Sequence, residues 1–234
     1  MLKPELINYG DSGLLISFSE HFSIEDWKKT HFLTNEIRKK NIRGILSIVP
    51  TLTSLFIHFD LLIIDRTNLL DWINRIIEEI NDKEIDLKSK HYKIPLAFGG
   101  EYGPDFDLIA EEVKKSKEEL IQAITSQPNR ILCFSRGPMM ESPINKSVKR
   151  VSSPRPSVPA GTLGIAFGQI SISSMDAPSG WKMLGQSPTT LFDHTAEPPG
   201  ILNPGDYLEF FAIEKDEYEF YKLKHIEGMD VDYE

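Results

Sequence analysis

The sequence predicts an α+β protein of two domains: an antiparallel sheet covered by two helices, followed by a mostly β domain. Within the first hundred residues, short apolar runs typical of strands alternate with segments whose apolar residues recur at helical spacings of three and four. After residue 130, short apolar runs are separated by proline and glycine turns, as in a barrel or sandwich. A length of 234 residues fits one large domain or two small ones, and we favour two.

The first domain shows its elements in a readable order. A strand at 14–18 follows a tight turn, and Ser23 and Asp26 then stand at capping-box spacing before a helix. Two strands of a hairpin follow, one ending at Pro50 and one over 54–59. Asn68 can cap a second helix. A strand at 91–98 completes the order βαββαβ, which predicts a ferredoxin-like domain over residues 1–98.

The second domain is expected over residues 99–234. Its start contains two short helices between residues 105 and 127, and Ser116 and Glu119 form a capping box for the second helix. A turn at 204–206 leads into a last core strand, YLEFFAI. These signals predict a β-barrel or sandwich with two short helices at its start.

Composition excludes several classes of function. The net charge of −9 and a pI near 5.2 argue against a nucleic-acid partner. No apolar run approaches the ~20 residues that span a bilayer, and the first residues lack a secretion-signal layout. We therefore expect a soluble cytoplasmic protein without a membrane partner. Cys133 is the single cysteine, so no internal disulfide can form, and we interpret it as a structural thiol in a strand.

Common catalytic motifs are missing from the chain. There is no Walker A loop, nucleophile elbow, HExxH or strand-linked GxGxxG, and the six histidines lack metal-ligand spacing. We expect no metal on this chain. His58 lies inside a strand, where a partly buried imidazole bonded to a backbone carbonyl is the favoured interpretation and a substrate contact the alternative.

Two glycine- and proline-rich stretches are candidate binding segments. Residues 98–105 either permit close approach of a ligand or form a sharp turn. In residues 152–169, Arg155 lies between two prolines and suits a carboxylate or phosphate, and Gln169 follows Gly168 and offers a donor and an acceptor. A surface salt bridge and a turn-stabilising amide are the alternatives. Trp181 either walls a pocket or fills the core.

The order of motifs resembles one family over nearly the whole chain. The motifs are GDSGLLISF, SLFIHFD, IPLAFGGEYGPD, PRPSVPAGTLGIAFGQ, APSGWKMLGQSP, LFD, EPP and PGD. In this order they resemble allophanate hydrolase subunit 1-like proteins. That family includes the KipI histidine-kinase inhibitor and the B subunit of the bacterial ATP-dependent 5-oxoprolinase, and it is similar to part of the carboxyltransferase region of urea carboxylase.

The resemblance implies a ferredoxin-like N-terminal domain and a cyclophilin-like β-barrel C-terminal domain. It also implies a companion carboxyltransferase-like subunit, similar to the C subunit of 5-oxoprolinase or to allophanate hydrolase subunit 2, with ATP used by the complex and no biotin on this chain. In the KipI branch the partner is a sensor histidine kinase. The positions that match the family are Arg155, Val158, Pro159, Ala160, Gly161, Gly164, Gly168, Gln169, Gly180, Trp181 and Gly185, with His58, Gly99, Gly100, Gly103, Pro104 and Asp105 in the earlier motifs.

Departures from the family pattern fall in two segments. In residues 133–142, Arg136 stands where the family has proline, and aromatic residues are missing. In residues 167–174, Phe167 replaces a glycine beside Gln169 and is expected to narrow the pocket. Ser157 and Gln186 replace basic residues of the family. These changes favour a specialised substrate or a non-catalytic binding role.

The leading hypothesis is a subunit of an ATP-dependent amide or lactam hydrolase similar to the B subunit of 5-oxoprolinase. Arg155 would hold an anionic group and Gln169 would bond an amide, from one cleft of the second domain. The alternatives are a KipI-like inhibitor of a sensor kinase and a component of a urea or allophanate pathway. The predicted substrate-binding residues are Arg155, Gln169, Gly168, Pro159, Gly161, Gly180, Trp181 and His58, and no catalytic residue is assigned.

Overall fold

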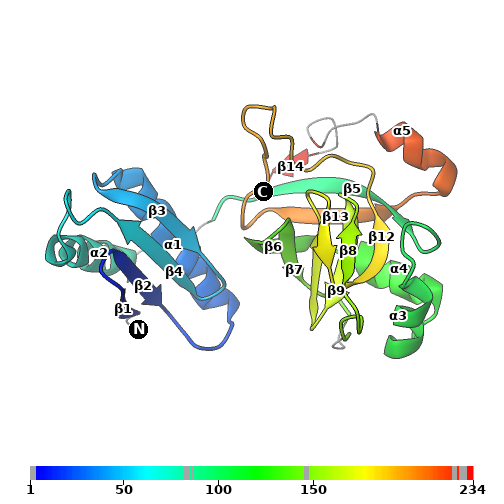
Figure 1. Ribbon diagram of the computed structural model, residues 1–234, viewed down its shortest axis with the longest axis horizontal. Helices are drawn as coiled ribbons and strands as arrows, with labels where there is room; N and C mark the ends of the chain where they lie inside the picture. The colour runs from blue at the N-terminus through cyan, green and yellow to red at the C-terminus, as the bar shows by residue number, and fades with distance from the viewer. Residues whose placement is uncertain are drawn as a thin grey trace. The chain divides into compact units, whose positions relative to one another are not determined.

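The computed structural model describes residues 4–81, 85, 87–144, 148–222, 226 and 231–233. The chain is a mixed α/β protein that divides into two compact units, Met1–Leu87 and Lys88–Glu234 (Figure 1). Each unit has its own hydrophobic core. The prediction of two domains agrees with this division, but the boundary differs from the expected one.

The first unit is an antiparallel four-stranded sheet with the strand order β1-β2-β4-β3. Its elements are β1 (Glu5–Tyr9), β2 (Gly13–Ser17), α1 (Ile24–Lys40), β3 (Ile45–Pro50), β4 (Ser54–Phe59) and α2 (Arg66–Asn81). Leu14 and Ile16 of β2 are fully buried and pack in one cluster with Leu33 of α1 and Ile73 of α2. The two helices therefore cover one face of the sheet.

Local capping signals predict the helix starts unequally well. The Ser23 side chain accepts a hydrogen bond from the Asp26 amide, so the predicted start of α1 is confirmed. The predicted cap of α2 is wrong. The helix begins at Arg66, and the Asp65 carboxylate accepts a hydrogen bond from the Asn68 amide, which lies inside the first turn. Both residues are good cap formers, and the one that precedes the helix takes the role.

The predicted closing strand of the first domain belongs to the second unit. Strand β5 (Lys90–Phe98) pairs in parallel with β13 (Tyr207–Ala212) and makes no ladder with the first sheet. The fourth strand of the first sheet is instead β1, whose short sequence ELINY carries no strong strand signal. The ferredoxin-like order βαββαβ and the boundary at residue 98 are therefore corrected: the first unit reads ββαββα and ends at Leu87. Residues 94–97 of β5 are buried without alternation, as suits a strand inside a barrel.

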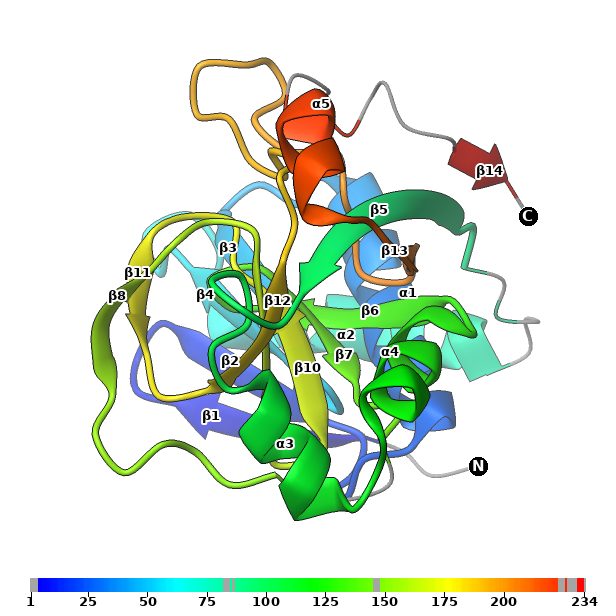
Figure 2. The same cartoon turned by 90° about the vertical axis from the view of Figure 1, so that its right-hand side faces the viewer.

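The second unit contains a closed seven-stranded barrel. Its strands follow the order β12-β9-β10-β7-β6-β13-β5, and a further pairing of β5 with β12 closes the ring (Figure 2). The remaining barrel strands are β6 (Asn129–Phe134), β7 (Pro138–Glu141), β9 (Thr162–Ala166), β10 (Gln169–Ile172) and β12 (Lys182–Gln186). The predicted barrel is confirmed, and its classification as cyclophilin-like stays a prediction.

Two helices pack beside the barrel and share its core. They are α3 (Phe106–Val113) and α4 (Lys117–Thr125), and their buried residues Ile109 and Leu120 belong to the same cluster as Ile165 and Ile170 of the barrel. Ser116 and Glu119 form the predicted capping box of α4. The two short helices are therefore confirmed.

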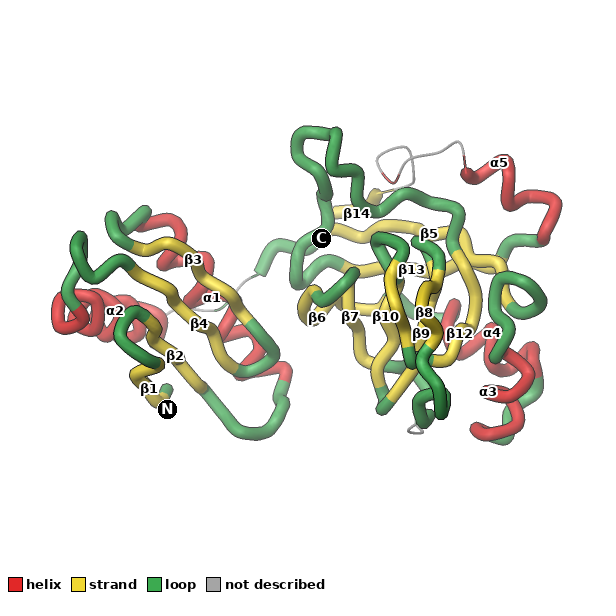
Figure 3. Tube along the Cα trace, viewed as in Figure 1, coloured by secondary structure: helices red, strands yellow, loops and turns green. Residues whose placement is uncertain are grey.

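A two-stranded antiparallel ribbon lies outside the barrel ring. It consists of β8 (Arg155–Val158) and β11 (Ala177–Ser179), and neither strand pairs with a strand of the barrel (Figure 2). The strands of both units are yellow in Figure 3. The chain ends with η1 (Lys215–Glu217), α5 (Tyr218–Lys222) and β14 (Val231–Tyr233), which pairs with β5. None of the helices in the described parts of the chain has the length and apolar character that crossing a membrane requires.

Candidate functional site

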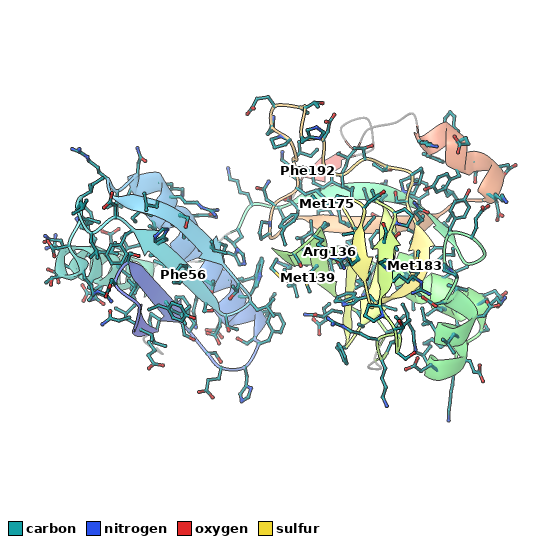
Figure 4. All side chains as sticks on the ribbon, viewed as in Figure 1. Phe56, Arg136, Met139, Met175, Met183 and Phe192 are labelled. Carbon is teal, nitrogen blue, oxygen red and sulfur yellow. The ribbon has the colours of Figure 1, made fainter. Side chains whose placement is uncertain are left out.

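A cavity of about 420 Å³ lies between the ribbon and the outer wall of the barrel. The outer wall consists of residues that alternate with core residues along the strands, such as Ser171 between Ile170 and Ile172. The lining residues are Ser135, Arg136, Met139, Arg150, Val158, Thr162, Gly164, Phe167, Gln169, Ser171, Ser173, Pro178, Ser179, Gly180, Trp181 and Met183. Figure 4 shows Arg136, Met139 and Met183 on this part of the second unit. The volume is in the range of small-molecule sites.

Two arginines are the only charged residues among the described residues that line the cavity. The Arg136 guanidinium donates to the backbone carbonyl of Pro178 and, over 3.4 Å, to the Ser179 hydroxyl of the ribbon. The Arg150 guanidinium carbon lies 5.6 Å from the centroid of the Phe167 ring. Neither arginine has a carboxylate partner in the described part of the chain. The cavity is therefore electropositive.

A row of hydroxyl and amide side chains forms one wall. Gln169 and Ser171 project from β10, and Ser173 follows directly after the strand. The Ser171 hydroxyl donates to the Pro138 carbonyl, whereas the Gln169 carboxamide is available to a ligand. Glu141 pairs with Gln169 in the register of β7 and β10 but does not line the cavity. This wall can offer donors and acceptors to a polar ligand.

Phe167 and Gly168 form the two-residue turn between β9 and β10. Both have positive φ, 52° and 75°, and Ala166 pairs with Gln169 across the turn. This turn geometry matches the twist of a hairpin, and glycine accepts it more readily than phenylalanine. Phe167 is 59% exposed and lines the cavity, in line with the expectation that it narrows the site.

Three of the predicted site residues lie together in the lining: Gln169, Gly180 and Trp181. Trp181 is partly buried, and a Cβ atom on Gly164 would lie 3.1 Å from its Cβ, so the indole packs directly over β9. Of the two roles considered for Trp181, its place in the lining agrees with a pocket wall. A Cβ on Gly180 would contact the Arg150 side chain at 3.6 Å.

Arg155 does not line the cavity. One of its terminal nitrogens, Nη2, donates to Asp105 Oδ1 over 2.8 Å, and the other carboxylate oxygen accepts from the Met183 amide, also over 2.8 Å. The Nη1 atom of Arg155 is buried without a partner in the described structure. Asp105 is 7% exposed and ties β8 to β12. The salt-bridge alternative for Arg155 therefore describes the structure better than the ligand-binding one.

The other predicted residues lie outside the lining. Pro159 and Gly161 are in the turn between β8 and β9, and a Cβ on Gly161 would lie 2.0 Å from the Ser187 carbonyl oxygen. Only glycine permits that approach, so Gly161 has a packing role. Gly168 is in the hairpin turn, with open space beside it. His58 is exposed on β4 of the first unit, so the predicted bond to a backbone carbonyl is not needed.

Sequence reasoning misses the two arginines that charge the cavity. Arg136 stands out in the sequence only as the loss of a family proline, although the same substitution introduces a guanidinium. Arg150 follows a segment without a strong motif, and its place beside Phe167 depends on the fold. Since no three histidine, cysteine or acidic side chains gather in the described parts of the chain, no metal centre is found there.

An apolar groove of about 390 Å³ adjoins the cavity and shares Ser135 and Arg136 with it. Phe134, Met175 and Phe192 line it and are between 40% and 49% exposed; the last two are labelled in Figure 4. The turn after β6 thus separates a polar cavity from an apolar surface.

Comparison with known proteins places this architecture in a family. The model for the carboxyltransferase domain, subdomain C and D, matches residues 4–202. The chain belongs to this family. It is 30% identical over 236 residues to the B subunit of 5-oxoprolinase from Bacillus subtilis, with 94% of this chain and 98% of the relative covered.

Solved structures support the fold. The protein TTHA0988 superimposes with a TM-score of 0.75 at 24% identity, over 86% of this chain and 40% of that one. The urea amidolyase of Kluyveromyces lactis superimposes with a TM-score of 0.76 at 20% identity, over 100% of this chain and 16% of that one. The chain therefore spans less than half the length of these solved relatives, and at these identities the likeness concerns the fold alone.

Proposed function

We propose that the chain is a subunit of an ATP-dependent amide or lactam hydrolase, of the type of the 5-oxoprolinase B subunit. The observation that carries the proposal is the likeness to the Bacillus subtilis protein, which extends over 94% of this chain and 98% of that protein. The likeness thus extends over nearly all of both chains. The chain would act with a companion carboxyltransferase-like subunit, and ATP would be used by the complex.

The proposed reaction opens a five-membered lactam. Hydrolysis breaks the bond between the ring nitrogen and the carbonyl carbon, and water supplies the oxygen to the carbon and the proton to the nitrogen. A second water is consumed as ATP is hydrolysed to ADP and phosphate, which would drive the ring opening, so the products would be glutamate, ADP and phosphate. This chain would bind and orient the substrate, with the Gln169 carboxamide placed to bond the amide group of the lactam.

The test is reconstitution with the companion subunits encoded by the same organism. We expect ATP-dependent release of glutamate from 5-oxoproline when all subunits are present, and none when this chain is omitted. A folded complex that consumes no ATP and releases no glutamate would contradict the proposal. Omission of the chain is the matched control, because it leaves every other component unchanged.

A urea or allophanate role is the second candidate. It is favoured by the likeness to the urea amidolyase of Lachancea kluyveri, 24% identical over 89% of this chain but only 13% of that protein. Consumption of urea by a complex that contains a biotin carboxylase, with no turnover of 5-oxoproline, would support it. Inhibition of a sensor kinase, as in KipI, stays a prediction that loss of kinase autophosphorylation on addition of the chain would test.

A further inference from the structure

We propose that Arg136 and Arg150 form a clamp for the carboxylate of a small organic anion bound in the cavity. The chemical class of the ligand is read from the cavity itself, and its identification as 5-oxoproline rests on the proposed function. The clamp differs from the predicted anchor, Arg155, which lies outside the lining and already has a carboxylate partner.

The charge balance of the cavity favours an anion. Both arginines line it, and none of the described lining residues is acidic. Two nearby acids of the second unit, Asp105 and Glu112, are engaged elsewhere, and Glu141, opposite Gln169 on β7, lies outside the lining. The Asp105 carboxylate bonds Arg155 and the Met183 amide, and Glu112 bonds Lys182 and the Lys149 amide. Two positive groups on one concave surface, where water is partly excluded, attract a negative ligand more strongly than they would in open solvent.

Arg136 donates to neutral groups, and hydrogen bonds to an anion would be stronger than these. Its guanidinium donates to the neutral carbonyl of Pro178 and to the Ser179 hydroxyl, the latter at the long distance of 3.4 Å. A hydrogen bond from a guanidinium to a carboxylate is shorter and about twice as strong as one between neutral groups. An incoming carboxylate can therefore engage the Arg136 donors, while the Pro178 carbonyl remains near enough to hold the side chain in place.

Arg150 is held by a contact that leaves its donors available. The Arg150 Cζ atom lies over the Phe167 ring at 5.6 Å from the ring centroid, and Arg150 is an exposed residue. A cation–π contact of this kind leaves most of the five N–H donors of the guanidinium available to a ligand. Phe167 thus orients the fork without occupying it. The turn that carries Phe167, with its positive φ of 52°, places the ring in contact range of Arg150.

The remaining lining indicates an organic anion with a polar body. A cavity of about 420 Å³ is much larger than a bare inorganic ion requires. Gln169 can donate to and accept from an amide, and Ser173 and Ser135 add hydroxyl groups to the lining. A carboxylate between the arginines and an amide against Gln169 would satisfy both halves of the site. 5-Oxoproline has both groups on one small ring.

The experiment compares two lactams that differ by the carboxylate. 5-Oxoproline and 2-pyrrolidinone are titrated into the full chain by isothermal calorimetry, at low and high salt. We expect 5-oxoproline to bind at least about tenfold more tightly than 2-pyrrolidinone, and its affinity to fall as the salt concentration rises. Arg136→Gln and Arg150→Gln should each weaken 5-oxoproline binding at least about tenfold. Arg43→Gln removes the same charge from an exposed residue of the first unit that is not part of the cavity lining, and should leave binding unchanged.

Several outcomes would overturn the clamp. Equal binding of the two lactams, an equal effect of Arg43→Gln, or inorganic phosphate binding as tightly as 5-oxoproline would each contradict it. If Arg136→Gln or Arg150→Gln unfolds the chain, Arg136→Lys and Arg150→Lys replace them, because lysine keeps the positive charge. The lysine variants should also weaken binding, since they lack the planar guanidinium fork.

Failure of the clamp and failure of the proposed function give different results. Arginine-dependent binding of 5-oxoproline with an inactive reconstituted complex would leave the clamp intact and remove the function. If the complex with the Arg136→Gln, Arg150→Gln double variant is active and its KM for 5-oxoproline is unchanged, the proposed function stands and the clamp is wrong.

Discussion

Arg155 lies in the ribbon of β8 and β11, and Arg136 contacts the same ribbon, but the two guanidinium groups differ in what balances their charge. Arg155, on β8, bonds the buried carboxylate of Asp105, whereas Arg136, after β6, bonds a carbonyl and a hydroxyl of β11. The first is a closed pair that holds the ribbon to β12 through Met183. The second leaves a net positive charge on the cavity. An arginine in a candidate binding segment therefore indicates a ligand site only when no carboxylate of the protein already forms an ion pair with it.

The sharpest way to break this comparison is to remove the buried carboxylate. Asp105→Ala should lower the free energy of unfolding by about 3 kcal/mol, because it leaves Arg155 without its counter-charge and the Met183 amide without an acceptor. Arg136→Gln should cost at most about 1 kcal/mol, since its partners are neutral. Urea unfolding, with amide hydrogen exchange of barrel peptides to report the second unit alone, measures both. Similar losses for the two variants would erase the distinction.

Adding a negative charge to the cavity sharpens the comparison from the ligand side. Gln169→Glu places a carboxylate on the polar wall, and we expect it to raise the KM for 5-oxoproline in the reconstituted complex at least about tenfold. Gln169→Leu, which removes the amide without adding charge, should have a smaller effect on KM. If the uncharged variant were the more damaging, hydrogen bonding rather than charge would dominate the site.

A second ion pair next to the cavity predicts a pH dependence of stability. The hydrogen bond from Lys182 lowers the pKa of Glu112 from its ordinary value of 4.5. A carboxyl group with a lowered pKa contributes stability that is present above 4.5 and is lost as the pH falls through its folded value. Glu112→Gln should therefore cost up to about 1 kcal/mol at pH 7 and reduce the loss of stability on acidification.

Chemical denaturation between about pH 7 and pH 3 tests this expectation. Glu111→Gln changes an exposed neighbour on the same helix and serves as the control. An acid profile of Glu112→Gln that follows that of the unmodified chain would contradict the role of the pair.

The smallest predicted effect concerns the contact that orients Arg150. Phe167→Asn relieves the strain of a positive φ but removes the stacked ring. In the Arg150→Gln background only the relief remains, and we expect a stabilisation of about 0.5–1 kcal/mol. In the unmodified chain the change should lie near zero, which gives a coupling of about 0.5–1 kcal/mol in a double-mutant cycle. A coupling of zero would mean that Phe167 does not hold the arginine.

Local signals in the sequence predict most elements but not their partners. Capping residues such as Ser23 and Ser116 act within three residues, so both helices start where expected. Strand β5 is predicted in the wrong sheet because its parallel partner β13 lies more than a hundred residues later in the chain. Pairing across such a separation leaves no local mark. The same limit applies to β1, whose place is fixed by its pairing with β2 rather than by its own short sequence.

The candidate site is predictable in part for a similar reason. Turns and flanking glycines single out Gln169, Gly180 and Trp181, and the fold brings these three into one lining. The sequence leaves Arg155 without a visible counter-charge because its carboxylate partner, Asp105, lies 50 residues earlier. The charge of the cavity comes from Arg136 and Arg150, which the fold alone brings to one surface.

The most direct test follows the arginine side chains themselves during titration. In the full chain labelled with ¹⁵N-arginine, the Nε–Hε signals of Arg136, Arg150 and Arg155 can be assigned from single Arg→Lys variants. On addition of 5-oxoproline, we expect the signals of Arg136 and Arg150 to shift together along one saturation curve while that of Arg155 stays in place. A shift of the Arg155 signal with the other two unchanged, or no shift of any of the three, would contradict the account.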